Sequence, residues 1–83
     1  MSALIQLHDH DVVALVMDTP AIHFETGQPL CLRCGQIGTV VMCYGDSMCE
    51  VEFADRQGHT YALLPIRTDQ LMVLHDSPEH AAA

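Results

Sequence analysis

The apolar residues of this chain fall into short runs that are separated by Gly, Pro and Asp. Val12–Met17 and Ile37–Tyr44 are rich in β-branched side chains, and Pro20 and Pro65 follow apolar runs as expected strand ends. Runs of about four to eight such residues between turn signals are typical of β-strands. No stretch keeps a helical period. We therefore expect an all-β chain.

Four further segments extend this pattern. His59–Leu64 and Leu71–Leu74 are expected strands, Arg67–Gln70 is long enough for one 3₁₀ turn, and Ala21–Gly35 is expected to be a long irregular loop. Eighty-three residues suffice for one small domain. These elements predict a small five-stranded SH3-like barrel with a long first loop and a 3₁₀ turn before the last strand, because a barrel closes its own sheet edges. We expect it to cover residues 11–75, after an N-terminal segment 1–10 and before a flexible tail 76–83.

Cys49–Phe53 alternates between apolar and acidic residues, which places Glu50 and Glu52 on the solvent side. A turn at 45–47 pairs Cys43 with Cys49, and the same register pairs Val41 with Val51 and Thr39 with Phe53. Directly opposed strand residues have Cβ atoms about 4.5–5.5 Å apart, more than a disulfide usually spans, so we expect both cysteines to pack as small hydrophobic residues. Gly38 indicates a bulge or bend. In 12–17 and 60–64, either set of alternate residues fits the side that faces the core. The expected core consists of Val13, Leu15, Ile37, Val41, Cys43, Cys49, Val51, Phe53, Leu63 and Leu71.

The charge balance is strongly acidic. Eleven Asp and Glu residues stand against three Arg and no Lys, which gives a net charge of −8. Such a chain repels phosphate backbones and anionic membranes, so we exclude nucleic-acid and membrane-surface binding and expect a basic protein partner. The first residues lack the basic region of a signal peptide, and no apolar run reaches the length of about 20 residues that a membrane helix needs. We expect a cytoplasmic protein.

Cys31-Leu32-Arg33-Cys34 has the spacing of half a zinc knuckle. His23 lies upstream in the same expected loop, but a tetrahedral site needs a further ligand and no second Cys-x-x-Cys exists. We expect two free or oxidised loop thiols and no cofactor, with a zinc site of Cys31, Cys34 and His23 as the alternative. His8 and His10 would form a copper or nickel chelate, although a solvated polar stretch is the expected interpretation.

Four segments in order carry a family resemblance. They are Asp11–Leu15, Gly35–Val41, Cys49–Phe53, and Tyr61–Leu64 with Asp69–Leu71. The chain resembles a bacterial family of short proteins catalogued as a domain of unknown function, in which Cys49–Phe53 corresponds to a Tyr-x-Val-Glu-Phe signature. The resemblance implies an SH3-like barrel and supplies no catalytic residues. Cys49 in place of tyrosine, and the Cys31–Cys34 pair, depart from the family pattern.

No acid/base pair with a nucleophile, complete metal site or phosphate-binding motif is discernible, so we expect no enzymatic activity. We expect a protein-interaction module whose acidic surface docks a basic protein, with immunity proteins and antitoxins as the analogous type. The expected contact surface is the loop 19–35 together with the turns 45–48 and 55–58. A zinc-binding accessory protein is the alternative function, and a monomer or a homodimer with a disordered loop is the alternative to partner binding. The expected contact residues are Phe24, Leu30, Leu32, Arg33 and Asp46.

Overall fold

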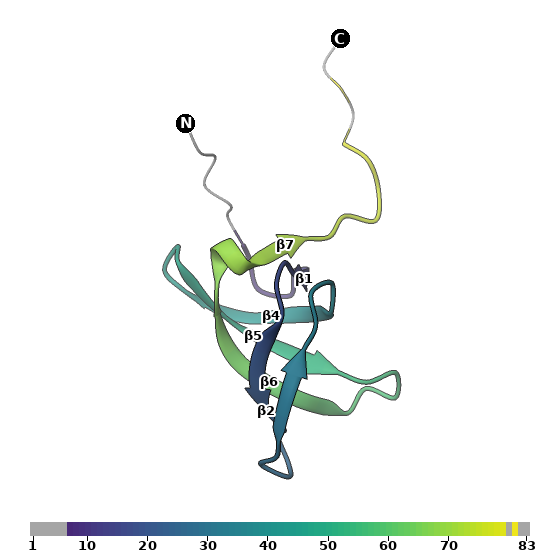
Figure 1. Cartoon of the computed structure of the whole chain (residues 1–83). Coiled ribbons are helices and arrows are strands. Elements are labelled where there is room, and N and C mark those ends of the chain that lie inside the picture. The colour runs from purple at the N-terminus through teal and green to yellow at the C-terminus, as the bar shows by residue number, and fades with distance from the viewer. Residues whose placement is uncertain (1–6, 80, 82–83) are drawn as a thin grey trace.

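The computed structural model describes residues 7–79 and 81, and Figure 1 shows its strands. The expectation of an all-β chain is confirmed, and within the described residues no helix is long and apolar enough to cross a membrane. The elements are β1 (Val12–Leu15), β2 (Thr19–Ile22), β3 (Pro29–Leu32), β4 (Ile37–Tyr44), β5 (Met48–Ala54), β6 (Thr60–Arg67), the 3₁₀ turn η1 (Thr68–Gln70) and β7 (Leu71–Val73).

Five strands form one antiparallel sheet in the order β6-β5-β4-β1-β7. The 3₁₀ turn lies before the last strand, as expected. β6 and β7 are the two edges of this sheet and are not paired with each other, so the hydrogen bonds do not close it into a barrel. The five-stranded SH3-like barrel is therefore not confirmed. What the structure establishes is an all-β fold of two sheets.

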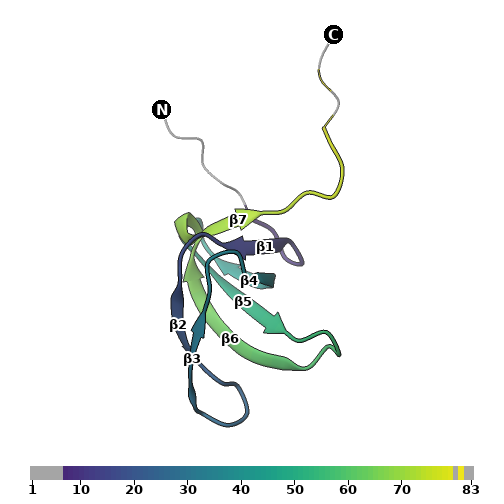
Figure 2. The ribbon, with the colours of Figure 1, turned by 45° about the vertical axis from the view of Figure 1, so that its right-hand side comes forward.

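The second sheet is the segment expected to be an irregular loop. β2 and β3 pair antiparallel, with Thr19 opposite Leu32 and Ile22 opposite Pro29, and Gly27 takes a positive φ of 74° in the turn between them. Glycine adopts this left-handed conformation without a steric cost. Figure 2 shows this β2–β3 hairpin standing beside the curved five-stranded sheet. The expectation of a long irregular loop is therefore wrong.

The core lies between the inner face of the large sheet and the hairpin. Val13, Leu15, Cys49, Val51, Phe53 and Leu71 are buried as expected. The other buried apolar residues are Leu7, Ala14, Leu32, Val40, Ala62 and Ile66. Leu7 comes from the segment that the sequence places before the domain, and its carbonyl oxygen lies 3.8 Å from Cys43 Sγ.

Three expected core residues are wrong: Ile37, Val41 and Leu63 are exposed. The register shifts between Val40 and Met42, so that Val40 and not Val41 stands opposite Val51. A β-bulge places one extra residue in a strand and turns the following side chains to the other face. Thr39 consequently pairs with Glu52 rather than with Phe53.

Gly38 does not mark this bulge. It lies in β4 with regular pairing to Val13, and a Cβ atom at this position would stand 2.7 Å from Cγ1 of Val51 and 2.8 Å from Cε1 of Phe53. Real Cβ atoms do not approach carbon atoms this closely. Glycine is therefore required here because the buried side chains of β5 occupy the space.

Cys43 and Cys49 stand directly opposite each other, as the register predicted, but they form a disulfide. Their Cα atoms are 3.9 Å apart, so the two strands approach more closely here than the usual cross-strand spacing on which the expectation of free packing rested. The expectation that both remain thiols is therefore wrong for this pair. Cys31 and Cys34 are free and exposed.

Candidate functional site

The three loops expected to form one contact surface separate into two regions. The tip of the β2–β3 hairpin and the β5–β6 turn meet at a pocket of about 410 Å³. The β4–β5 turn lies instead against η1, where Thr68 donates hydrogen bonds to the carbonyls of Asp46 (from Oγ1, 2.9 Å) and Ser47 (from N, 3.0 Å). The hairpin tip and the β4–β5 turn lie at opposite ends of the molecule in Figure 1. The residues that line the 410 Å³ pocket are His23, Glu25, Asp55, His59, Thr60 and Tyr61.

The expected contact residues have different environments. Phe24 is 58% exposed at the hairpin tip, and Arg33 and Asp46 are also exposed. Leu30 is half-buried and packs against the core. Leu32 is 1% exposed, so its side chain stabilises the hairpin against the sheet and is not available to a partner.

Arg33 is held by a local network. Its guanidinium contacts Oδ2 of Asp18 at 3.1 Å, and the other carboxylate oxygen of Asp18 accepts a hydrogen bond of 2.8 Å from the amide of Cys34. The Cys34 amide and the Arg33 guanidinium hold the pKa of Asp18 below its ordinary value. This network fixes the turn after β3.

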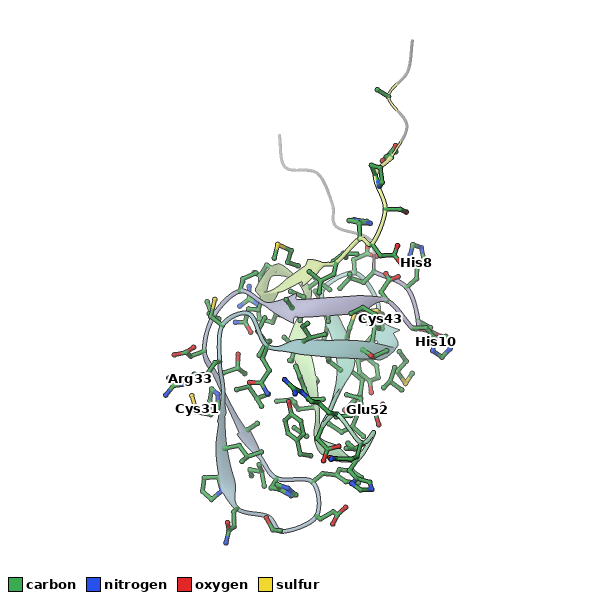
Figure 3. All side chains as sticks on the ribbon, turned by 90° about the vertical axis from the view of Figure 1, so that its right-hand side faces the viewer. His8, His10, Cys31, Arg33, Cys43 and Glu52 are labelled. Carbon is green, nitrogen blue, oxygen red and sulfur yellow. A yellow bond between two sulfur atoms is a disulfide. The ribbon has the colours of Figure 1, made fainter. Side chains whose placement is uncertain are left out.

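The structure does not bring the three expected zinc ligands together. Cys31 and Cys34 lie at the end of the hairpin that joins β4, whereas His23 lies in its tip, where Nδ1 accepts hydrogen bonds from the amides of Glu25 and Thr26. Among the described residues, no group of three or more His, Cys, Asp or Glu side chains is arranged to hold a metal ion. Figure 3 shows Cys31 and Arg33 on the opposite side of the molecule from His8 and His10.

Glu50 and Glu52 lie on the outer face of β5, as expected, and each is half-buried. Glu50 accepts a hydrogen bond of 2.7 Å from the hydroxyl of Tyr44, and Glu52 accepts one from the hydroxyl of Thr60. The bond to Glu50 raises the pKa of Tyr44, because it favours the protonated phenol. Both carboxylates are thus tied to neighbouring strands, an arrangement that stabilises the sheet.

A larger pocket of about 720 Å³ lies along β7, and the sequence analysis did not find it. Its walls combine apolar side chains of Val16 and β7 with the polar groups of two Asp and two His, and they contain no Lys or Arg. The closest basic contact is Arg67, whose guanidinium pairs with Asp69 at 2.6 Å. We call this the β7 pocket, and it is lined by His8, Asp11, Val16, Asp69, Leu71, Met72, Val73 and His75.

No single stretch of the sequence marks the β7 pocket. Asp69 and Met72 belong to η1 and β7, whereas His8 and Asp11 precede β1, and these segments are about 60 residues apart in the chain. They meet because β7 pairs with β1, with Ala14 opposite Met72. The pairing of first and last strands has to be known before these residues can be grouped.

Comparison with known proteins identifies a family. Residues 9–73 match the model of a family described as a domain of unknown function (DUF4926). The matched range starts just before β1 and ends at the last residue of β7, so it covers every strand. Curated proteins and solved structures give no match. Since the family model covers most of the chain, the protein belongs to the DUF4926 family.

Proposed function

We propose that this chain is a non-catalytic interaction module that binds a basic protein partner. The observation that carries the proposal is the composition of the β7 pocket, which joins exposed apolar surface to the carboxylates of Asp11 and Asp69 without any Lys or Arg in its lining. Apolar surface bordered by polar groups is typical of protein contact sites. The charge of Asp69 is compensated by Arg67, so Asp11 is the lining carboxylate that attracts a basic partner and accelerates its encounter.

Charge supports the same conclusion for the whole chain. Of the three arginines, Arg33 and Arg67 are each paired with an Asp, so their positive charges are locally compensated. Each pair also neutralises one Asp, so the net charge of −8 resides on the other nine acidic residues, which face a single remaining arginine, Arg56. An immunity protein or antitoxin, bound to a basic toxin or enzyme encoded beside it, is the role that we favour by analogy with other stand-alone small barrels.

The SH3-like relationship implied by the resemblance is part of this proposal. It is supported by the order of the five-stranded sheet, in which the first strand lies between β4 and the last strand, and by η1 directly before β7. The hairpin that packs on this sheet through Leu32 takes the place of the long first loop. A crystal structure with the edges of β6 and β7 fully separated by solvent would contradict an SH3-like description.

A cytoplasmic location is also proposed, and the Cys43–Cys49 disulfide gives it a test. Disulfides are rare in a reducing cytoplasm. Alkylation of thiols in intact host cells, followed by mass spectrometry, is expected to label Cys43 and Cys49 if the protein is cytoplasmic and reduced. Labelling confined to Cys31 and Cys34 would place the protein in an oxidising compartment.

The interaction itself is tested by purifying the tagged chain from its native host at low salt. A stoichiometric partner is then identified by mass spectrometry, purified separately and titrated by calorimetry at several salt concentrations. We expect a basic partner whose affinity falls with salt, because screening acts over about 10 Å at 0.1 M. Absence of a stoichiometric partner would refute the proposal. About one zinc per chain, lost on C31S/C34S substitution, would replace it with the metal-binding alternative.

A further inference from the structure

Three of the four outer strands in this fold carry a proline that faces away from the sheet. In the hairpin, the amide of His23 donates to the carbonyl of Gln28 at 2.8 Å, so alternate pairs along β2 and β3 are hydrogen-bonded. Pro20 and Pro29 fall between those pairs, which turns their ring nitrogens outward. A proline in this position cannot donate to an added strand. Both edges of the hairpin are therefore blocked.

The edge of β6 is blocked twice. The amide of Val40 is bonded toward β1, to the carbonyl of Asp11, and the alternation across β4 and β5 then places the ring nitrogen of Pro65 on the outer edge of β6. Farther along the same edge, the carbonyl of Tyr61 accepts a hydrogen bond of 2.8 Å from the amide of Phe24. The hairpin tip therefore covers the start of this edge, and Pro65 interrupts it farther along.

The edge of β7 has no such protection. The amide of Val16 donates to the carbonyl of Gln70 (3.1 Å), and the amide of Leu74 donates to the carbonyl of Val12 (2.9 Å), so these residues of the β7 segment face β1. The alternation turns the N–H and C=O of Val73 outward. Among the described residues, none is hydrogen-bonded to the N–H or the C=O of Val73, whereas the outward N–H of Leu71 donates to the carbonyl of Thr68. β7 therefore presents a free donor and a free acceptor.

The surroundings of this edge suit an extended segment. All three residues of β7 line the β7 pocket, and Met72 is 52% exposed. Asp11 lies in its wall, and Asp76 lines a neighbouring pocket that shares Asp11, whereas Asp69 is already paired with Arg67. A strand that brings alternating basic and apolar side chains would pair with these carboxylates and cover the exposed methionine.

We propose that a basic, extended segment of the partner adds to β7 as a sixth strand of the sheet. This inference rests on the proposed function and names its binding site and mode. A second copy of the chain is a poorer occupant, because pairing of two β7 strands would bring the Asp76 carboxylates of two molecules, each with net charge −8, to the same edge. Like charges across a strand pair are destabilising.

The test introduces into β7 an outward-facing proline like those of the other edge strands. Val73→Pro removes the outward N–H without removing a bond to β1, since Val73 and Val13 form a pair that is not hydrogen-bonded. Val73→Ala is the matched control, which loses the same side-chain packing and keeps the N–H. Circular dichroism and urea unfolding check that both variants fold.

The probe is a soluble, end-capped peptide in which arginine and valine alternate. Its binding is measured by NMR of the ¹⁵N-labelled full chain. We expect shifts centred on the Val73 amide and on β7, and affinity that is weakened about tenfold by Val73→Pro but not by Val73→Ala, the scale of one lost hydrogen bond with a steric penalty. The same peptide with alternate amides N-methylated is expected not to bind, and this comparison decides the question even if Val73→Pro fails to fold. Equal binding of the methylated peptide, or shifts away from β7, would overturn the proposal.

Two further outcomes separate this inference from the proposed function. A purified native partner that binds the Val73→Pro variant as tightly as the original chain would refute strand addition and leave the interaction module standing. Peptide binding at β7 without any native partner would keep the site and refute the module. A concentration-dependent dimer that Val73→Pro dissociates, seen by sedimentation, would assign the edge to a second copy and overturn the choice of occupant.

Discussion

The amide of Phe24 donates a hydrogen bond of 2.8 Å to the carbonyl of Tyr61 and so joins the tip of the β2–β3 hairpin to the outer edge of β6. The hairpin is otherwise attached at its other end, where the turn after β3 is hydrogen-bonded to Leu15 and Asp18. Leu32 lies between these attachments and fills the core. The Phe24–Tyr61 bond therefore holds the hairpin tip to β6, in addition to the packing of Leu30 and Leu32 on the core.

Phe24→Pro is expected to release the hairpin tip, because proline cannot donate to Tyr61. Amide hydrogen exchange should then accelerate in β2 and β3 while β4 and β5 stay protected, since local openings follow the contacts of each segment. Phe24→Ala keeps the amide and serves as the control, with near-native exchange expected. Equal acceleration in both variants would mean that the side chain, and not the hydrogen bond, attaches the tip.

Local alternation was enough to predict β5 and its partner across the tight turn. Cys49, Val51 and Phe53 are buried, and Cys43 stands opposite Cys49, because a short turn fixes the register of neighbouring strands. The same reasoning failed two residues farther from the turn, at Val41. A bulge inserts one residue without any change in composition, so periodicity alone does not reveal it.

Two prolines explain other differences between the expected and the observed strands. Pro65 was expected to end a strand, yet it lies inside β6, and Pro29 begins a strand inside the expected loop. Both are compatible with strands because their nitrogens face outward at a sheet edge. Which strands are edges depends on the pairing of distant segments. The β7 pocket has the same origin, since it forms only when Asp11 and Asp69 are brought together by the pairing of β1 with β7.

Gly38→Ala is expected to destabilise the fold by about 1–3 kcal/mol, the usual cost of overpacking a core. The added Cβ would clash with Val51 Cγ1 at 2.7 Å and Phe53 Cε1 at 2.8 Å. Urea unfolding measures the change. In a Val51→Ala background one of the two clashes is absent, so Gly38→Ala should cost less there, which a double-mutant cycle detects. Strict additivity would show that the β4 backbone moves away instead.

Reduction of the Cys43–Cys49 disulfide is expected to lower the free energy of unfolding by about 2 kcal/mol, the chain-entropy value for so short a loop. The comparison is urea unfolding with and without a thiol-free reductant. The C31S/C34S variant should respond like the original chain, because its disulfide is intact, whereas C43A/C49A should not respond. A response that disappears in C31S/C34S would mean that the exposed cysteines form the bond that matters for stability.

Stability is expected to fall in acid, with Asp18 and Asp55 contributing. The pKa of Asp18 is lowered first by the Cys34 amide and then by Arg33, and the pKa of Asp55 is lowered chiefly by the His59 amide. A carboxyl whose pKa is lower in the folded state stabilises the fold above its ordinary value of 3.8 and loses this contribution as the pH falls through its folded pKa. Thermal unfolding across this range measures the loss.

Asp18→Asn provides the control for this acid sensitivity. The amide oxygen can still accept from Cys34, but it does not titrate and does not attract Arg33. The variant should be less stable at neutral pH and should lose less stability on acidification than the original chain. An unchanged pH profile would indicate that other carboxyls cause the acid sensitivity.

Tyr44 is expected to titrate at higher pH than an ordinary tyrosine. Its hydroxyl donates to Glu50 at 2.7 Å, and this hydrogen bond is the main reason that its pKa lies above the ordinary value of 10.0. The chain has two tyrosines and no tryptophan, so alkaline absorbance reports the phenols directly. Glu50→Gln removes the negative charge and should bring the Tyr44 transition down, while Tyr44→Phe identifies which transition is lost. If Glu50→Gln left the titration curve unchanged, the Tyr44–Glu50 bond would not persist in solution, and Glu50 would be free to meet a partner.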